Sequence, residues 1–368
     1  MRAIQVARPG DPCELVERPL TECQPAAFSR RNLLLGGAAF MAASISRHQS
    51  ATAAVRNEAI AQPSDYAVLG RLEVRIANLG LRDGYGLGLE TERGIIDVSA
   101  TANALGLACP SDMDELLQNG RGAELRALIA AIADRPQAAV IVSKEKVSFA
   151  PLVTRPEKII CVGFNYRQHA EETQTPIPVV PALFNKYNNA LNRHGGEIKL
   201  PTHVDDRFDY ETELVIVIGR ECFNVSESEA LDYVAGYATG NDFSARRLQT
   251  ATTQFMAGKT CNGFAPVGPW LVTRARVPDP NRLGLKTWVN GALRQDSNTS
   301  DMIFDCRKLI SFASSLMTLK PGDLLFTGTP QGVIFGERKP LEQRRWLRAG
   351  DEVVSLLEGL GDLRVMLV

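Results

Sequence analysis

The chain lacks several features that would assign it to a class at once. Its seven cysteines are scattered and show no Cys-x-x-Cys spacing, which disfavours a zinc site or a disulfide framework. The formal net charge is -1 and no stretch interleaves basic and aromatic residues, which disfavours a nucleic-acid partner. No internal repeat or low-complexity segment is present. One apolar run near the N-terminus is too short and too rich in Gly and Ala for a stable membrane span.

What is present is the composition of an ordinary globular protein, 45% hydrophobic and 23% charged, over 368 residues. That length favours two folded units. Arg71–Ile76 alternates as a half-buried strand does, and Ser226-x-x-Glu229 is typical of a capping box for a helix that runs to about Val234. Together with the Gly- and Pro-bounded strands after Lys158, these patterns predict an α+β, β-rich chain. The expected parts are a leader over 1–53, a linker over 54–65, a small α+β domain over 66–150 and a larger β-rich domain over 156–368.

The first part of the chain has the pattern of a twin-arginine export signal. Arg30 and Arg31 precede a moderately apolar segment that continues to Ile45, and Ala51-Thr52-Ala53 is a candidate cleavage site. The sequence therefore predicts a periplasmic protein whose mature chain begins near Ala54. The alternative is a cytoplasmic protein whose leader is a false match or whose start is misassigned, because the region before Arg30 is long.

Two glutamates stand at the head of an apolar run from Asp209 to Ile218. Side chains alternate along a strand, so Glu211 and Glu213 point to the same face. Two like charges beside an apolar run are costly unless a cation neutralises them, and a hard divalent metal takes such oxygen ligands. A solvent-facing strand end explains the pair equally well. Asp242, in an Asn-Asp pair after a later apolar strand, is a candidate third ligand, although Asn-Asp is also a common turn.

A second group of candidate residues has the character of acid–base chemistry. His169 and Glu172 are three residues apart, so one helical turn places them side by side. A carboxylate beside imidazole fixes which ring nitrogen is free to take a proton, as a general base acting on water requires. Lys259, in a Gly-bounded loop, and Thr329, in a Gly-Thr-Pro turn, are suited to holding a carboxylate or an enolate. The alternatives are an exposed helix face, a solvated lysine and a plain turn.

In their order along the chain, these segments resemble the fumarylacetoacetate hydrolase family from about Lys158 to the C-terminus. The resemblance implies a mixed β-roll or barrel after a small N-terminal domain, usually in a homodimer. The matching motifs are Asn-Tyr-x-x-His at 165–169, Asp-Tyr-Glu-x-Glu-Leu at 209–214, Gly-Asn-Asp-x-Ser-Ala-Arg at 240–246, Gly-Lys-Thr at 258–260, the run 294–304 and Thr-Gly-Thr-Pro-x-Gly-Val at 327–333.

The resemblance also implies roles for single residues. His169 and Glu172 would form a water-activating pair on a mobile lid, and Lys259 would act in catalysis. Many relatives carry an aspartate where this chain has Asn262, which removes a possible charge near the site. The implied ligands of Mg²⁺ or Mn²⁺ are Glu211, Glu213 and Asp242. The implied substrate contacts are Arg246, Gln249, Thr329 and the supportive Lys186.

The expected activity is metal-dependent hydrolysis of a C–C bond in a 2,4-dioxo acid, an acylpyruvate or a fumarylpyruvate-like acid. Water activated by His169 and Glu172 would attack the distal carbonyl, and the resulting enolate would be held by the metal and Lys259. Isomerase, hydratase or decarboxylase chemistry on a 2-oxo dioic acid is the alternative within the family. A non-catalytic periplasmic protein that binds oxo acids is the alternative of another class.

Overall fold

The computed structural model describes residues 3–5, 14–16 and 63–368. Strands β1 (Ala3–Gln5) and β2 (Glu14–Val16) pair antiparallel within a first unit over 1–57. The paired arginines, the candidate cleavage site and the linker up to 62 lie outside the described residues, so the export signal stays a prediction. The last residues of the expected linker belong to helix α1 (Pro63–Leu69).

Within residues 63–368 the largest sheet has ten strands, and most neighbours in it are antiparallel. Strand β3 pairs with β16, which joins the N-terminal strands to those of the larger part. The two-domain division of this region at 150–156 stays an expectation. The spatial order is β6 (Ile141–Val142), β5 (Gly94–Asp97), β4 (Gly84–Thr91), β3 (Arg75–Leu81), β16 (Leu271–Thr273), β13 (Val234–Asn241), β12 (Thr212–Ile218), β19 (Leu324–Phe326), β7 (Ile159–Gly163) and β8 (Ala182–Lys186).

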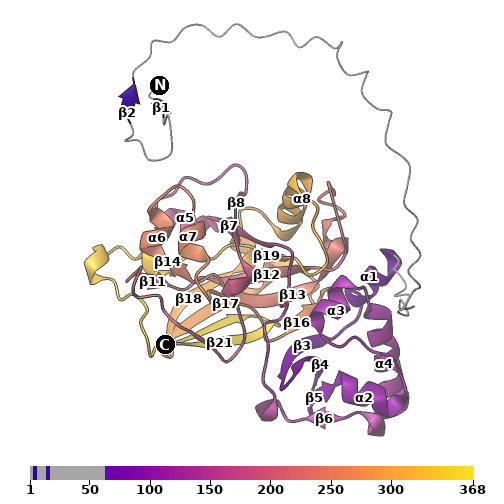
Figure 1. Ribbon diagram of the computed structural model, residues 1–368. Coiled ribbons are helices and arrows are strands. Elements are labelled where there is room, and N and C mark those ends of the chain that lie inside the picture. The colour runs from indigo at the N-terminus through magenta and orange to yellow at the C-terminus, as the bar shows by residue number, and fades with distance from the viewer. Residues whose placement is uncertain (1–2, 6–13, 17–62) are drawn as a thin grey trace, which may run out of the picture. The chain divides into compact units, whose positions relative to one another are not determined.

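A second sheet in the described part has five strands and lies beside β12 and β13 (Figure 1). Its order is β10 (Gly196–Ile198), β21 (Gly361–Leu367), β20 (Glu352–Leu357), β17 (Gly284–Val289) and β18 (Ala292–Asn298). Two short pairs complete the strands: β11 (Phe208–Asp209) with β14 (Ser244–Ala245), and β9 (Leu191–Asn192) with β15 (Ala265–Pro266). The described strands form open sheets without a closed barrel, and the expected α+β, β-rich class is confirmed.

The helices lie in two groups. Helices α2, α3 and α4 lie beside β3–β5, whereas α5, α6 and α7 gather near β11 and β14 (Figure 1). Among the described residues, no helix is long and apolar enough to cross a membrane. The bounds are α2 Val98–Leu105, α3 Met113–Gln118, α4 Gly122–Asp134, α5 Arg167–Glu172, α6 Arg246–Thr250, α7 Met256–Lys259 and α8 Cys306–Leu316.

Strand β12 is the centre of the larger part because it is buried on both faces. All seven of its residues are buried. Leu214 and Ile216 pack into one hydrophobic cluster, whereas Val215 and Val217 pack into another on the opposite side. A strand that alternates between two apolar cores cannot slip by one residue without exchanging its faces. The register of the carboxylates at its head is therefore firmly set.

Two local expectations were wrong. The strand expected over Arg71–Ile76 begins at Arg75, and before it the Thr273 hydroxyl donates to the carbonyl of Leu72 and accepts the N–H of Val74. The helix expected to end at about Val234 is a 3₁₀ turn over Ala230–Tyr233. The hydroxyl of Ser226 bonds to the carboxylate of Glu229 at 2.6 Å, so it caps no backbone group.

Candidate metal and active site

Three carboxylates converge at the head of β12. Glu213 is the second residue of β12, Glu211 immediately precedes the strand, and Asp242 follows β13. Because Thr212 lies opposite Asn241 in the β12–β13 ladder, residues 211 and 242 are neighbours, and the N–H of Asp242 donates to the carbonyl of Glu211 at 2.8 Å. One oxygen from each carboxylate lies within 4.8 Å of the others, and all three residues are buried. The alternation of faces along the strand is as the sequence predicts.

Two lysines contact this group. The Nζ atom of Lys259, at the end of α7, lies 2.5 Å from Glu211 Oε2 and 2.8 Å from Asp242 Oδ2. Lys186, at the end of β8, donates to Asp242 Oδ1 and to the carbonyl of Phe264, and its side chain is fully buried. Lys186 was expected as a supportive substrate contact; it pairs with Asp242 and does not line the small cavity described below, and the substrate contact stays a prediction.

Glu213 differs from its two neighbours because no described lysine or arginine bonds to it. Its Oε2 accepts the backbone N–H of Gly328 at 2.7 Å. Burial, followed by the charges of Asp242 and Glu211, raises the pKa of Glu213 well above its ordinary value. The protein therefore leaves one carboxylate of the group without a cationic partner.

Glu211 is in the opposite situation. Burial alone would raise its pKa, but the cations Lys259 and Arg246 outweigh burial and lower the pKa of Glu211 to about 2. Arg246 Nη1 lies 2.6 Å from Glu211 Oε1. This carboxylate is thus ionised at any physiological pH.

The residues of the group fit a hard divalent cation. Three buried carboxylates supply the oxygen ligands that Mg²⁺ and Mn²⁺ prefer, and a dication would offset the charge that Glu213 carries when it is ionised. Cysteine sulfur, which would favour Zn²⁺, is not among the group. Among the described residues, no other group of three or more Asp, Glu, His or Cys side chains lies close enough together to hold a metal ion.

The expected His–Glu pair is formed within α5. His169 Nδ1 lies 3.3 Å from Glu172 Oε2, and Glu172 also accepts the N–H of Gly332 at 3.0 Å. Glu172 is therefore fixed as an acceptor, so the Nδ1 proton of His169 points to it and Nε2 is free to act as a base. The ring of Phe164 stacks on His169 with centroids 6.1 Å apart, and Phe164 has a φ of 54°, a strained conformation for a bulky residue.

A small cavity lies between α5 and the carboxylates. Its volume is about 40 Å³. Four phenylalanines, at 164, 184, 255 and 335, form an apolar wall that would exclude bulk water. Of the residues expected in the site, those that line the cavity are His169, Glu211, Glu213, Arg246, Gln249, Lys259 and Thr329.

Arg246 and Thr329 are held mainly by other protein groups. Arg246 Nη1 donates to Gln249 Oε1 at 2.8 Å, and its Nε and Nη2 donate to Asp209 at 2.9 and 2.6 Å. The hydroxyl of Thr329 donates to the carbonyl of Thr212 at 3.0 Å and accepts from Gln295 at 2.9 Å. Their expected substrate contacts stay predictions, and the structure adds a positioning role to each.

Several buried polar residues around the site belong to the matching motifs, although the sequence assigns them no role. Asn165 donates to the carbonyls of Phe304 and Thr327, which ties the end of β7 to the strand that leads to Thr329. Asp209 and Gln295 hold Arg246 and Thr329, as described above. The sequence signal that could have found them is a polar residue among apolar ones. It does not identify their hydrogen-bond partners, because those lie far away in the chain.

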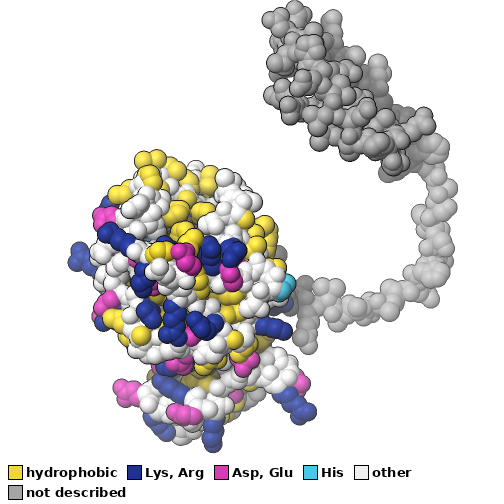
Figure 2. All heavy atoms as spheres, turned by 90° about the vertical axis from the view of Figure 1, so that its left-hand side faces the viewer, with side chains coloured by type: hydrophobic (Ala, Val, Ile, Leu, Met, Phe, Trp, Pro, Cys, Tyr) yellow, Lys and Arg dark blue, Asp and Glu magenta, His cyan; other side chains and the backbone are white. Residues whose placement is uncertain are grey.

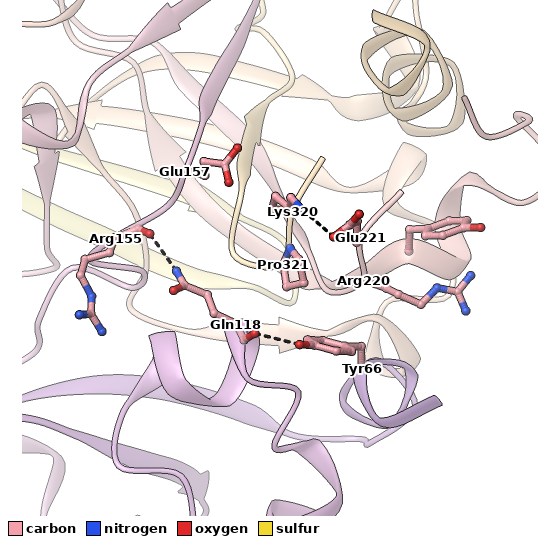
Figure 3. A pocket seen from close by; sticks show the side chains of 9 residues that line it. Tyr66, Gln118, Arg155, Glu157, Arg220, Glu221, Lys320 and Pro321 are labelled. Carbon is pink, nitrogen blue, oxygen red and sulfur yellow. Dashed lines mark hydrogen bonds and ion pairs between the residues drawn. The ribbon is translucent and has the colours of Figure 1, made fainter. Parts of the chain in front are cut away.

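A larger hollow lies elsewhere, between the N-terminal helices and the turns at the far ends of β12 and β19 (Figure 3). Its volume is about 880 Å³. Tyr66 and Gln118 face the turn at Lys320 there, and Lys320 pairs with Glu221 at 2.6 Å. None of the expected site residues lines it. The smaller cavity, which the expected site residues line, is therefore the candidate active site despite its smaller volume.

The comparisons with known proteins decide the family. A family model described as "Fumarylacetoacetate (FAA) hydrolase C-terminal" matches residues 158–368. The chain belongs to the fumarylacetoacetate hydrolase family. The match begins within one residue of β7 and includes every candidate site residue.

Relatives within the family carry different activities in their names. The chain is 38% identical to a mitochondrial oxaloacetate tautomerase of Xenopus laevis over 75% of this chain and 83% of that protein. It is 30% identical to a 2-hydroxyhepta-2,4-diene-1,7-dioate isomerase from Mycobacterium marinum, with a TM-score of 0.60 over 80% of this chain and 98% of the other. It is also 30% identical to maleylpyruvate hydrolase from Sphingobium sp. SYK-6, in complex with manganese(II) ion and pyruvate, with a TM-score of 0.64 over the same shares. Family members are thus hydrolases, isomerases and tautomerases.

Proposed function

We propose that this chain is a divalent-metal-dependent enzyme that interconverts the keto and enol forms of a short 2-oxo dioic acid of the oxaloacetate class. The observation that carries the proposal is that His169, paired with Glu172, lines one small cavity together with Glu211 and Glu213 of the carboxylate group. The tautomerase relative, which matches over most of both chains, supports this ranking above hydrolysis.

In this reaction His169 Nε2 removes a proton from the carbon next to the ketone. The electron pair of the broken C–H bond forms the new C=C bond, and the ketone oxygen takes a proton to give the enol. Glu172 holds the imidazolium that forms, through Nδ1. The ammonium of Lys259, beside Glu211 and Asp242, is placed to donate to the ketone oxygen as negative charge develops there.

Glu211, Glu213 and Asp242 would hold the metal. When bound, Mg²⁺ or Mn²⁺ supplies Lewis-acid polarisation of the ketone. The manganese in the Sphingobium hydrolase supports Mn²⁺ as the first ion to test.

Hydrolysis of a C–C bond in a 2,4-dioxo acid, ranked first from the sequence, is the second candidate. The maleylpyruvate hydrolase supports it, because the solved structure of that protein is a complex with manganese(II) ion and pyruvate. In hydrolysis His169 would take its proton from water, and the enolate of pyruvate would leave. The two candidates use the same residues and differ in whether a water molecule has access to Nε2.

The test measures both reactions with the full chain, in EDTA and in Mn²⁺ or Mg²⁺. Decay of the oxaloacetate enol is followed by its ultraviolet absorbance above the buffer rate, and pyruvate release from acylpyruvates is followed with lactate dehydrogenase. Metal-dependent enol decay without pyruvate release supports the tautomerase. Pyruvate from an acylpyruvate would favour the hydrolase. Binding of either acid with no turnover, in the wild type as in His169→Ala, would favour a binding protein.

Export and assembly are further parts of the proposal. The twin-arginine pattern supports a periplasmic mature chain, which the mass of the protein in a periplasmic fraction would test. Exposed apolar side chains follow α5, among them Ile177, Val179 and Val180, at 51, 91 and 58% exposure. Figure 2 shows hydrophobic side chains on the face that carries α5–α7. They support the expected homodimer, which light scattering in solution would test.

A further inference from the structure

Asp209, the last residue of β11, bonds to more partners than any role so far assigned to it requires. It is fully buried, next to the carboxylates but outside the cavity. Its Oδ1 accepts the N–H groups of Tyr210 and Ile334, each at 2.9 Å. Its Oδ2 accepts the N–H of Phe335 at 2.9 Å and both Nε and Nη2 of Arg246. Five donors thus converge on one carboxylate.

On one side, these bonds lead to the carboxylates. Arg246 is shared between Asp209 and Glu211, which lies 2.6 Å from its Nη1. While Asp209 takes two of the N–H groups, it offsets the charge of the guanidinium. Glu211 is then free to share its own charge with a metal ion as well.

On the other side, the bonds of Asp209 lead to the His169–Glu172 pair. Glu172 is seated on the segment 332–336: it accepts the N–H of Gly332, and a Cβ placed on Gly336 would lie 2.2 Å from its carboxyl carbon. Ile334 and Phe335, which Asp209 holds, lie between these two glycines. Asp209 therefore fixes the segment at its middle.

We infer that Asp209 is a positioning residue that sets both halves of the site at once, the charge available at Glu211 and the seat of Glu172. It touches neither substrate nor metal and acts through Arg246 and through residues 334–335. The kinetic part of this inference rests on the proposed function, whereas its structural part does not.

Asp209→Asn is a sharp probe because an amide cannot replace this carboxylate in either orientation. Each oxygen faces at least two donors, so the NH₂ group is always set against N–H groups. The matched control is Asp206→Asn, since Asp206 pairs with Arg247 in an exposed position on the same two segments. Gly336→Ala is a third variant, which disturbs the seat of Glu172 alone.

The first measurement is hydrogen exchange of the full wild-type chain with and without Mn²⁺. Metal binding is expected to slow exchange over 330–337, with the hairpin at 352–367 as internal reference. No slowing relative to that reference would overturn the inference, and this result needs no variant to fold.

The variants are then compared by Mn²⁺ titration calorimetry, kinetics and exchange. Asp209→Asn is expected to raise the Mn²⁺ Kd and lower kcat, each about tenfold or more, with faster exchange at 334–335. Gly336→Ala is expected to lower kcat and leave the Mn²⁺ Kd unchanged, and Asp206→Asn to change neither. Faster exchange in Asp209→Asn with an unchanged Kd and kcat would make Asp209 merely structural and overturn the inference. A wild-type chain without turnover would refute the proposed function. The hydrogen-exchange and Mn²⁺-binding results would still test the positioning role of Asp209.

Discussion

Replacing Glu213 by glutamine is expected to remove metal binding without unfolding the chain. The oxygen of the new amide can still accept the N–H of Gly328, which Glu213 accepts at 2.7 Å. No described lysine or arginine bonds to Glu213, so the variant leaves no buried cation unpaired. The fold should therefore lose less than about 1 kcal/mol. The metal ion, in contrast, loses a buried charge partner worth about 3 kcal/mol or more. That is a hundredfold or greater rise in Kd.

Titration calorimetry with Mn²⁺, together with urea unfolding in EDTA, measures the two effects separately. Glu221→Gln, at the exposed partner of Lys320, is the matched control and should alter neither. A variant that binds Mn²⁺ like the wild type would show that the three carboxylates are not the ligand set. A variant that fails to fold without metal would show that Glu213 is compensated by contacts other than the Gly328 bond.

The remaining predictions concern the base, a buried lysine and a half-buried ion-pair cluster around Glu90. His169→Gln should lower kcat about a hundredfold or more with an unchanged Mn²⁺ Kd, measured by enol decay and calorimetry; an unchanged kcat would exclude His169 as the base. Lys186→Met should lower the free energy of unfolding in EDTA by about 3 kcal/mol, because buried Asp242 loses one of its two cations; no loss in urea unfolding would contradict this. Burial acts to raise the pKa of Glu90, but bonds from Lys144 and Arg75 outweigh it and lower that pKa below 4.5. The stability that the ion pairs of Glu90 contribute is therefore present above pH 4.5 and is lost as pH falls through the lowered pKa. Glu90→Gln should cost about 1 kcal/mol at pH 7 and nothing at pH 2, by thermal unfolding at both; a cost independent of pH would refute the sign.

The local geometry of the site could be predicted from the sequence wherever the signal is short-range. The alternation of faces put Glu211 and Glu213 together, and the spacing of His169 and Glu172 put those side chains on one helical turn. Both patterns need only the periods of strand and helix, 2 and 3.6. The buried β12 adds a register that cannot shift, so the prediction for its head was reliable.

The partners of these groups could not be predicted, because they come from far along the chain. Lys186 is the last residue of β8, an edge strand, and reaches Asp242 because β8 pairs antiparallel with β7. Nothing near Lys186 in the sequence distinguishes a lysine that contacts substrate from one that pairs with a carboxylate behind the site. The failed capping box at Ser226 has a different, local cause, because its hydroxyl bonds to the side chain of Glu229 and not to a backbone N–H.

The arrangement of cations explains why so many charged residues can be buried together. Four carboxylates, Asp209, Glu211, Glu213 and Asp242, face three cations, Lys186, Lys259 and Arg246, which leaves one negative charge in excess when all four carboxylates are ionised. A dication would turn this excess into one positive charge. A carboxylate of a 2-oxo acid would then be attracted to the metal-bound site. The same residues would thereby make substrate binding depend on metal binding, without a dedicated basic residue for the substrate carboxylate.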